Sequence, residues 1–377
     1  TQLKASEYVD KGIPVINVRN IGFGDVKKED LEYLNDAKAE KLHQHHLRKG
    51  DIVFGRKGAV ERHALIDETV DGWIQGSDCL RLRIRSQDIC ERYLSHYFKT
   101  KAHQDWMQAL CSFGATMSSL NQDIVRRISF PAPPIIVQKK ITATLTAYDK
   151  LIENNQRRIA LLEKMAEEIY REWFVRLRFP GYEKVKKVKG VPEGWEIKKL
   201  GSVLELCYGK ALKDDDRVSG EFHVYGSSGV VGTHNESLVK TPGLIVGRKG
   251  NVGSVYWSDR GFFPIDTVYY VKSELPNSFL YFLLRSMNFI NNDAAVPGLN
   301  RNQAYSNLFF LPPAQLIKRY VEIADSLFKM KRVLTRKNEY LTSMRDKLLP
   351  RLISGKLSVE HLDIQFPPGM EESVHDI

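Results

Sequence analysis

Two long segments of the chain have the spacing of an amphipathic helix. Neither glycine nor proline interrupts the first between Ile135 and Pro180, and its apolar residues recur at steps of three and four. The second follows Pro313 and keeps a similar stripe until Pro350 and Gly355, which are expected to end it. At ~1.5 Å per residue, roughly 40 residues make a rod of about 60 Å for the first segment and somewhat less for the second.

The two stripes predict that these helices pair with each other. Antiparallel pairing through the apolar faces would form a two-stranded coiled coil. The alternative, two ordinary core helices in separate domains, is disfavoured because globular helices rarely run this long. The first stripe includes Leu151 and Met165. The residues expected to make the pairing contacts are Ile141, Leu145, Ile152, Ile159, Leu162, Leu327, Leu334, Leu341 and Met344.

The rest of the chain has a different pattern. Residues 1–133 and 191–311 show short β-branched or aromatic runs separated by Gly, Asn and Asp, as in 14–18, 222–225 and 267–271. Each block also has one apolar helical stretch late in its span, around 92–98 and 279–284. Both blocks are therefore expected to be strand-rich mixed domains.

The sequence repeats itself in two places. Gly55-Arg56-Lys57-Gly58 follows an apolar run and recurs as Gly247-Arg248-Lys249-Gly250, and a double proline precedes each long helical segment. The order is thus globule, helix, globule, helix. We predict an α+β fold in which two strand-rich mixed α/β domains are separated by two long antiparallel helices with a pseudo-two-fold internal repeat. The predicted boundaries are 1–133, 134–180 for the central helix, 181–190 for a basic linker, 191–311, 312–355 for the C-terminal helix, and 356–377 for a tail.

Charge narrows the class of partner. The 377 residues carry a formal net charge of +10 with 42% hydrophobic residues, which fits a globular protein that binds nucleic acid. The surplus is uneven, since residues 134–190 have 13 basic and 7 acidic side chains whereas 191–311 have 12 of each. Part of the surplus positive charge lies in the linker lysines, which are expected to bind DNA independently of its sequence. These are Lys184, Lys186, Lys187 and Lys189.

Several classes of site and location are disfavoured. No apolar stretch approaches 18 residues and no signal pattern opens the sequence, so a cytoplasmic protein without a membrane partner is expected. The four cysteines form no Cys-x-x-Cys pair and are expected to be reduced and buried. The histidines at 43–46 and the aspartates at 214–216 lack accompanying ligands, so both are interpreted as solvated loops and no metal is predicted.

The two Gly-Arg-Lys-Gly segments are candidate DNA contacts. One copy alone would be a plain turn as readily as a binding loop, but its recurrence in both domains favours binding. Glycine lets the backbone approach a phosphate, and arginine can bind guanine O6 and N7. The residues predicted to do so are Arg56, Lys57, Arg248 and Lys249.

Two further groups are candidates. Segments 116–122 and 297–303 are rich in Asn, Gln and Ser, which suit base edges and phosphates, although helix capping explains part of this composition. A third group lies at expected strand ends. The candidates in the paired segments are Ser118, Ser119, Asn121, Gln122, Asn300, Arg301 and Asn302, and those at strand ends are Asn17, Arg19, Lys210, Tyr225, Ser227 and Ser228.

Four strings in this order resemble the specificity subunit of type I DNA restriction–modification systems. They are the proline-rich segment leading to Gln138-Lys139-Lys140-Ile141, the segment 170–176 (YREWFVR), Pro192-Glu193-Gly194-Trp195, and 347–357 (KLLPRLISGKL). The resemblance implies two target-recognition domains that each bind half of a split double-stranded DNA site. It also implies two helices that dock two methyltransferase subunits, restriction subunits in the full complex, and no catalytic activity in this subunit.

The helices are then expected to act as a ruler that fixes the unread spacer between the half-sites. Motifs for nucleotides, methyl donors or flipped bases are missing, so no cofactor is predicted. Two alternatives are a methyltransferase or nuclease with an unrecognised centre, and a coiled-coil adaptor that does not bind DNA. Trp195 precedes Tyr225 by thirty residues, and Tyr225 is matched to Ile16, so an opening strand of the first domain is expected to be absent or supplied by other residues.

Overall fold

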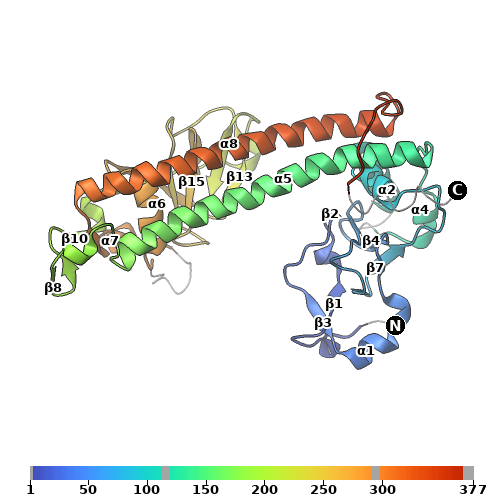
Figure 1. The fold of residues 1–377 in the computed structure, drawn as a ribbon, viewed down its shortest axis with the longest axis horizontal. Coiled ribbons are helices and arrows are strands. Elements are labelled where there is room, and N and C mark those ends of the chain that lie inside the picture. Colours follow the sequence, from blue (N-terminus) through green and yellow to red (C-terminus); the bar gives the residue numbers. More distant parts are fainter. Residues whose placement is uncertain (1–2, 113–118, 290–297, 368–377) are drawn as a thin grey trace. The chain divides into compact units, whose positions relative to one another are not determined.

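The structure is a computed structural model that describes residues 3–112, 119–289 and 298–367. It divides into two compact units, each described below by itself (Figure 1). The first unit comprises Thr1–Glu153 with Glu339–Ile377, and the second comprises Asn154–Asn338. Each unit therefore combines one strand-rich domain with part of each long helix. None of the helices in the described chain has the length and apolar character that crossing a membrane requires.

Two small sheets form the domain of the first unit. The four-stranded sheet has the order β2-β5-β4-β7 and the three-stranded sheet the order β3-β1-β6, in which β1 and β6 are parallel. The strands are β1 (Ile13–Ile16), β2 (Phe23–Gly24), β3 (Glu32–Leu34), β4 (Ile52–Gly55), β5 (His63–Leu65), β6 (Ile74–Gln75) and β7 (Cys79–Leu82). The helices are α1 (Asp36–Lys41), α2 (Glu91–Phe98), α3 (Lys101–Ser112) and α4 (Gln122–Arg126).

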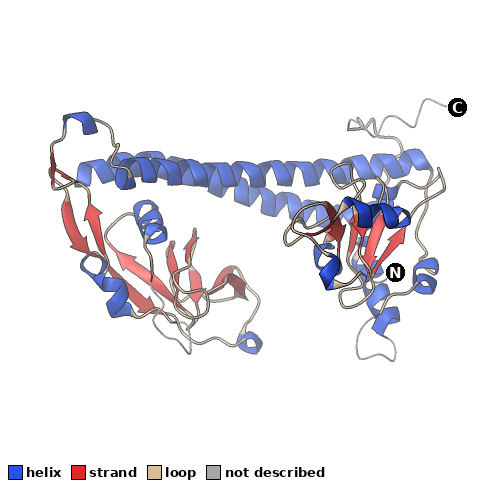
Figure 2. Cartoon of the chain, turned by 90° about the horizontal axis from the view of Figure 1, so that it is seen from below, coloured by secondary structure: helices blue, strands red, loops and turns tan. Residues whose placement is uncertain are grey.

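The domain of the second unit repeats this plan. Its sheets have the orders β11-β17-β14-β15 and β13-β12-β16, and β12 and β16 are parallel as β1 and β6 are. Strands are drawn in red in Figure 2. Two strand pairs, β8-β9 and β10-β18, accompany them. The strands are β8 (Lys187–Val188), β9 (Val191–Pro192), β10 (Glu196–Lys199), β11 (Leu204–Tyr208), β12 (Phe222–Gly226), β13 (Gly229–His234), β14 (Gly243–Gly247), β15 (Val255–Ser258), β16 (Phe262–Pro264), β17 (Val268–Ser273) and β18 (Leu308–Leu311), and the helices are α6 (Asn277–Ser286) and α7 (Arg301–Ser306).

Hydrogen bonds show which residues of the two domains correspond. The Gly76 N–H donates to the Ile16 carbonyl at 3.0 Å, and the Ile265 N–H donates to the Tyr225 carbonyl at 2.9 Å. Ile16 and Tyr225 thus occupy the same position in the repeat, as the sequence predicted. One difference lies at the sheet edge. Strand β17 pairs with β11 along its outer edge. The corresponding strand β7 is an edge strand, with no further partner strand among the described residues.

The two predicted long helices are present. α5 spans Ile135–Tyr170 and continues as a π-helical turn over Arg171–Val175, and α8 spans Ala314–Ile353. In the second unit, three contacts show that the helices are antiparallel, because rising α5 numbers meet falling α8 numbers. They are Asn155 Nδ2 to Asn338 Oδ1 at 2.8 Å, Lys331 Nζ to Glu163 Oε2 at 2.6 Å, and Tyr320 Oη to the Ala166 carbonyl at 3.3 Å.

Burial along both helices agrees with most of the predicted stripe. All nine expected pairing residues are buried or half-buried: Ile141, Leu145, Ile152, Ile159, Leu162, Leu327, Leu334, Leu341 and Met344. Leu151 and Met165, however, are each 52% exposed, so their assignment to the stripe was wrong. Each directly precedes a buried residue, Ile152 or Ala166, and a step of one residue turns a helical side chain away from its neighbour's face.

The predicted end of the second helix also needs a correction. α8 continues through Pro350, because Leu349, Leu352 and Ile353 bury themselves in a core with α5 residues. Packing of this last turn outweighs the loss of one backbone donor at proline. Gly355 then adopts φ +74° and its N–H donates to the Leu352 carbonyl, which ends the helix.

The two units have separate cores. In the first, α2 packs on the helix pair through Tyr93, which lies in one cluster with Ile141, Leu145 and Leu352. In the second, a larger aromatic cluster joins Tyr170, Phe174, Phe279 and Tyr320. The four cysteines form no disulfide, and Cys90 is half-buried while the other three are buried as expected.

Candidate DNA interface

In the first domain, the Gly-Arg-Lys-Gly loop directly follows β4. Arg56 and Lys57 are exposed, and Gly58 has the positive φ, +79°, that favours glycine. Lys57 forms an antiparallel bridge with Ser119, and the Leu120 N–H donates to the Arg56 carbonyl at 2.8 Å. Leu120 is fully buried, so it anchors this contact. Two segments that the sequence identified separately are therefore neighbours.

The second domain repeats this arrangement. Lys249 forms an antiparallel bridge with Gly298, and the Leu299 N–H donates to the Arg248 carbonyl at 2.8 Å. Leu299 is buried in the aromatic core, and Gly250 has φ +76°. The same backbone frame thus presents an Arg-Lys pair in both domains.

Asparagines cap the short helices that follow these contacts. Asn121 Oδ1 accepts from the Ile124 N–H at 2.9 Å, and Asn300 Oδ1 accepts from the N–H groups of Asn302 and Gln303. The capping explanation for these two residues is therefore correct for their side-chain oxygens. Gln122 and Asn302, next to the caps, are exposed. Ser118 lies outside the described residues.

The third group lies beside the loop in the second domain. The Ser227 carbonyl accepts from Ser254 Oγ and Tyr256 Oη, both at 2.9 Å, and Asn251 Nδ2 donates to Ser228 Oγ at 3.5 Å. Ser227 and Ser228 are thereby fastened to the residues just after Lys249. Tyr225 is only 6% exposed, so its side chain belongs to the core.

Lys210 is held near the end of β16. Its N–H donates to the Pro264 carbonyl at 3.0 Å, and its side chain is exposed. A Cβ at the preceding residue, Gly209, would lie 2.0 Å from the Ile265 carbonyl oxygen. Glycine is therefore required there for the backbone to pass and to place Lys210.

The corresponding group in the first domain faces a carboxylate. Arg19 lies 3.1 Å from Glu32, and Asn17 Nδ2 donates to Glu32 Oε2 at 2.6 Å. Val18, between them, lies against Gly55 at the start of the cationic loop. Glu32 offsets the charge of Arg19, so this group contributes less positive potential than the loop itself.

Known proteins share this organisation. The family model of the type I restriction modification DNA specificity domain matches residues 2–164 and 192–341, one match for each repeat. The chain belongs to the type I restriction–modification DNA specificity family. This membership makes it a specificity subunit, the DNA-recognition component of a type I restriction–modification system, and not a catalytic one.

Relatives support the assignment. The chain is 24% identical to the type I restriction enzyme MjaIX specificity subunit of Methanocaldococcus jannaschii, over 74% of this chain and 72% of the relative. It is 22% identical to the putative MjaX specificity subunit of the same organism, over 95% and 90% of the two chains. The fold resembles the crystal structure of the S subunit of a type I restriction–modification system from M. genitalium, with a TM-score of 0.57, 18% identity, and coverage of 93% and 91%.

The specificity subunit also has an aromatic residue at the loop that sequence reasoning missed. Tyr208, the last residue of β11, has the guanidinium carbons of Arg248 and Arg301 over its ring, at 4.9 and 4.5 Å from the centroid. The available signal was an aromatic residue at the end of the run LELCY (204–208), directly before Gly209-Lys210. That signal is weak, because most aromatic residues in strands belong to the core.

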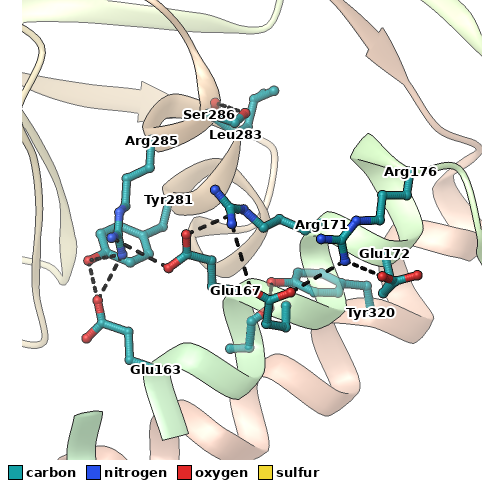
Figure 3. Close-up of polar contacts among 12 residues, drawn as sticks. Glu163, Glu167, Arg171, Glu172, Arg176, Tyr281, Leu283, Arg285, Ser286 and Tyr320 are labelled. Carbon is teal, nitrogen blue, oxygen red and sulfur yellow. Dashed lines mark hydrogen bonds and ion pairs between the residues drawn. The ribbon is translucent and has the colours of Figure 1, made fainter. Parts of the chain in front are cut away.

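Polar contacts fasten helix α6 of the specificity subunit to α5 (Figure 3), and Lys331 on α8 binds the same carboxylate of α5. Glu163 on α5 accepts from Tyr281 Oη at 2.8 Å, Arg285 at 3.1 Å and Lys331 at 2.6 Å. Burial tends to raise the pKa of Glu163, but the Lys331 and Tyr281 hydrogen bonds and the nearby cations outweigh it, so its pKa is lowered. The carboxylate stays charged and joins three helices of the second unit.

Proposed function

We propose that this specificity subunit reads a bipartite double-stranded DNA site, with one half-site contacted by each domain. The observation that carries the proposal is the repeated frame, in which an Arg-Lys loop is hydrogen-bonded to a segment anchored by a buried leucine. Arg56, Lys57 and Lys249 are exposed, and Arg248 is half-buried. Leu120 anchors it in the first domain and Leu299 in the second.

The side chains of the frame suit DNA. Arg56 and Arg248 can each donate two hydrogen bonds to guanine O6 and N7, while Lys57 and Lys249 suit phosphate oxygens. Exposed Gln122 and Asn302 add amides that can pair with adenine edges. Because the loops are held by backbone hydrogen bonds at both ends, their side chains are displayed from a rigid frame.

A selection experiment tests the division into half-sites. The full chain, with its methyltransferase partner if that is needed for binding, is incubated with a randomised duplex library, and bound sequences are read. Wild type is expected to return two conserved blocks separated by a spacer of any sequence. Arg56→Gln with Lys57→Gln should relax one block, and Arg248→Gln with Lys249→Gln the other.

A matched control separates base reading from charge loss. Arg336 and Lys337 are an exposed Arg-Lys pair on α8, outside both loops. Arg336→Gln with Lys337→Gln removes the same charge and should leave both blocks unchanged. A wild-type chain that selects no sequence, or a loop variant that relaxes both blocks equally, would contradict the proposal. Absence of salt-sensitive binding to DNA would favour the protein-adaptor alternative.

We further propose that α5 and α8 act as the ruler for the spacer. Lengthening both helices by one turn, ~5.4 Å, should lengthen the preferred spacer by one or two base pairs. Lengthening α5 alone is the control, because it moves its stripe out of register with α8 and should weaken binding instead. An unchanged spacer after the double insertion would exclude the ruler.

Methyltransferase subunits are proposed to dock on the helices, with restriction subunits joining in the full complex. Apolar side chains left exposed on α5, Leu161 and Met165, support such a contact. Leu161→Ser with Met165→Ser should weaken co-purification of the methyltransferase subunit and leave DNA selection by the chain intact. Full co-purification would place the docking surface elsewhere.

A further inference from the structure

Arg248 and Arg301 come together in the second domain although they lie far apart in sequence. Arg248 belongs to the cationic loop after β14, and Arg301 is the first residue of α7. Both guanidinium groups lie over the ring of Tyr208, which is 49% exposed. Two like charges gathered at one ring repel each other, so an arrangement that keeps them there calls for a physical explanation.

Aromatic rings and backbone carbonyls hold the two arginines. The negative face of the Tyr208 ring attracts both cations, and Tyr269 contributes a second ring at 5.9 Å from Arg248. Arg248 Nη1 donates to the Asp266 carbonyl at 2.9 Å, and Arg301 Nη1 donates to the Leu206 carbonyl at 3.4 Å. Within residues 3–112, 119–289 and 298–367, no carboxylate forms an ion pair with either arginine. Their positive charge therefore remains available to a ligand.

Tyr208 itself is fixed in place. It pairs with Tyr269 across β11 and β17, with ring centroids 5.1 Å apart, and Tyr269 Oη donates to the Leu299 carbonyl at 3.0 Å. Leu299 in turn donates its N–H to the Arg248 carbonyl. The Tyr208 ring, the Arg248 loop and the buried Leu299 are thus connected in one cluster.

The described residues of the first domain contain no such cluster. Strand register matches Leu80 to Tyr269, and the helix caps match Gln122 to Arg301. No described strand pairs with the outer edge of β7, so Tyr208 has no counterpart in the first domain. Arg56 lies over no aromatic ring of the described residues. The pairing of arginines over a tyrosine is thus a property of the second domain.

We propose that Tyr208 is a specificity-determining positioning residue, which holds Arg248 and Arg301 together so that they read guanine in the half-site of the second domain. This rests on the proposed function. A guanidinium held on a ring has lost part of its rotamer freedom before DNA arrives, so less is lost on binding guanine O6 and N7. Tyr208 acts through the arginines and need not touch a base.

The test compares ring removal with hydroxyl removal in the full chain. Tyr208→Leu and Tyr208→Phe are put through selection with the randomised duplex library, and binding is then measured on the best duplex and on duplexes with single guanine replacements. Tyr208→Leu should lower discrimination at guanine positions of the second block by about tenfold, the equivalent of one arginine–guanine pair. Tyr208→Phe keeps the ring and should behave as wild type.

Two controls make the outcome decisive. Tyr340 on α8 is more exposed than Tyr208, and Tyr340→Leu should change no block. Thermal unfolding of Tyr208→Leu checks that the second unit still folds, and Arg248→Gln identifies which block the second domain reads. Preserved guanine discrimination in Tyr208→Leu, an equal loss in both blocks, or a second block without guanine each overturns the inference. A wild-type chain that selects no blocks overturns the proposed function instead.

Discussion

The two recognition domains share a backbone frame and differ in the side chains around it. Both hold an Arg-Lys loop by a hydrogen bond from a buried leucine, Leu120 or Leu299. In the second domain Arg248 lies over Tyr208, whereas in the first the neighbouring cation, Arg19, is paired with Glu32. The repeat therefore preserves the backbone that positions the side chains, whereas the side chains themselves differ between the domains. Two different half-sites would require such a difference.

The units differ in their buried polar groups as well. The first unit buries His63, His96 and His103. His223 and His234, in the second unit, are both half-buried. The first unit thus buries imidazoles beside its phenyl and phenol rings, whereas both histidines of the second unit are half-buried, so the two units should respond differently to acid.

The largest expected effect comes from cutting an aromatic ring out of one core at a time. Phe98 in the first unit and Phe279 in the second are almost completely buried. Phe98→Ala and Phe279→Ala should each lower the free energy of unfolding of their own unit by about 3–5 kcal/mol. Scanning calorimetry should show two transitions, each moved by one variant only. A single transition that both variants lower would mean that the units unfold as one, and would remove the basis for comparing them.

Acid should destabilise the first unit more than the second. Burial lowers the pKa of His63 to about 3, assisted by the Lys99 charge, and burial lowers that of His103 to about 4. The unfolded imidazoles titrate near 6.5. Below that pH the unfolded chain binds protons that the folded unit does not, so this stability is present above pH 6.5 and is lost as pH falls.

The expected size at pH 5 is on the order of 2 kcal/mol for each fully buried imidazole. Calorimetry between pH 7.5 and 5 should therefore show the transition of the first unit falling faster than that of the second. Neither ring nitrogen of His103 has a hydrogen-bond partner among the described residues. His103→Phe should thus reduce the slope for the first unit, and equal slopes in both units would refute the assignment.

Sequence patterns predicted the elements better than their contacts. The steps of three and four residues located both long helices, because burial of one face is a local, periodic signal. The stripe was wrong at Leu151 and Met165, which are apolar but lie just beside the buried face of the helix. The adjacency of Lys57 with Ser119 was not predictable, since it depends on how separate strands pack. Tyr208 was missed for the same reason, because only the fold brings Arg301 to its ring.

The smallest expected effect on sequence preference concerns the linker lysines, and it separates affinity from reading. Lys184, Lys186, Lys187 and Lys189 are exposed and lie outside both loops. Changing all four to Gln should weaken binding to every duplex alike and flatten the salt dependence by up to about 0.9 in logarithmic slope for each phosphate that is no longer neutralised. Gel shifts between about 50 and 200 mM salt measure this.

The matched control changes four other exposed lysines to Gln: Lys4, Lys11, Lys27 and Lys28. Altered block sequences in the linker variant would show that the linker reads bases, and that the loops are not the main source of the difference between the two domains.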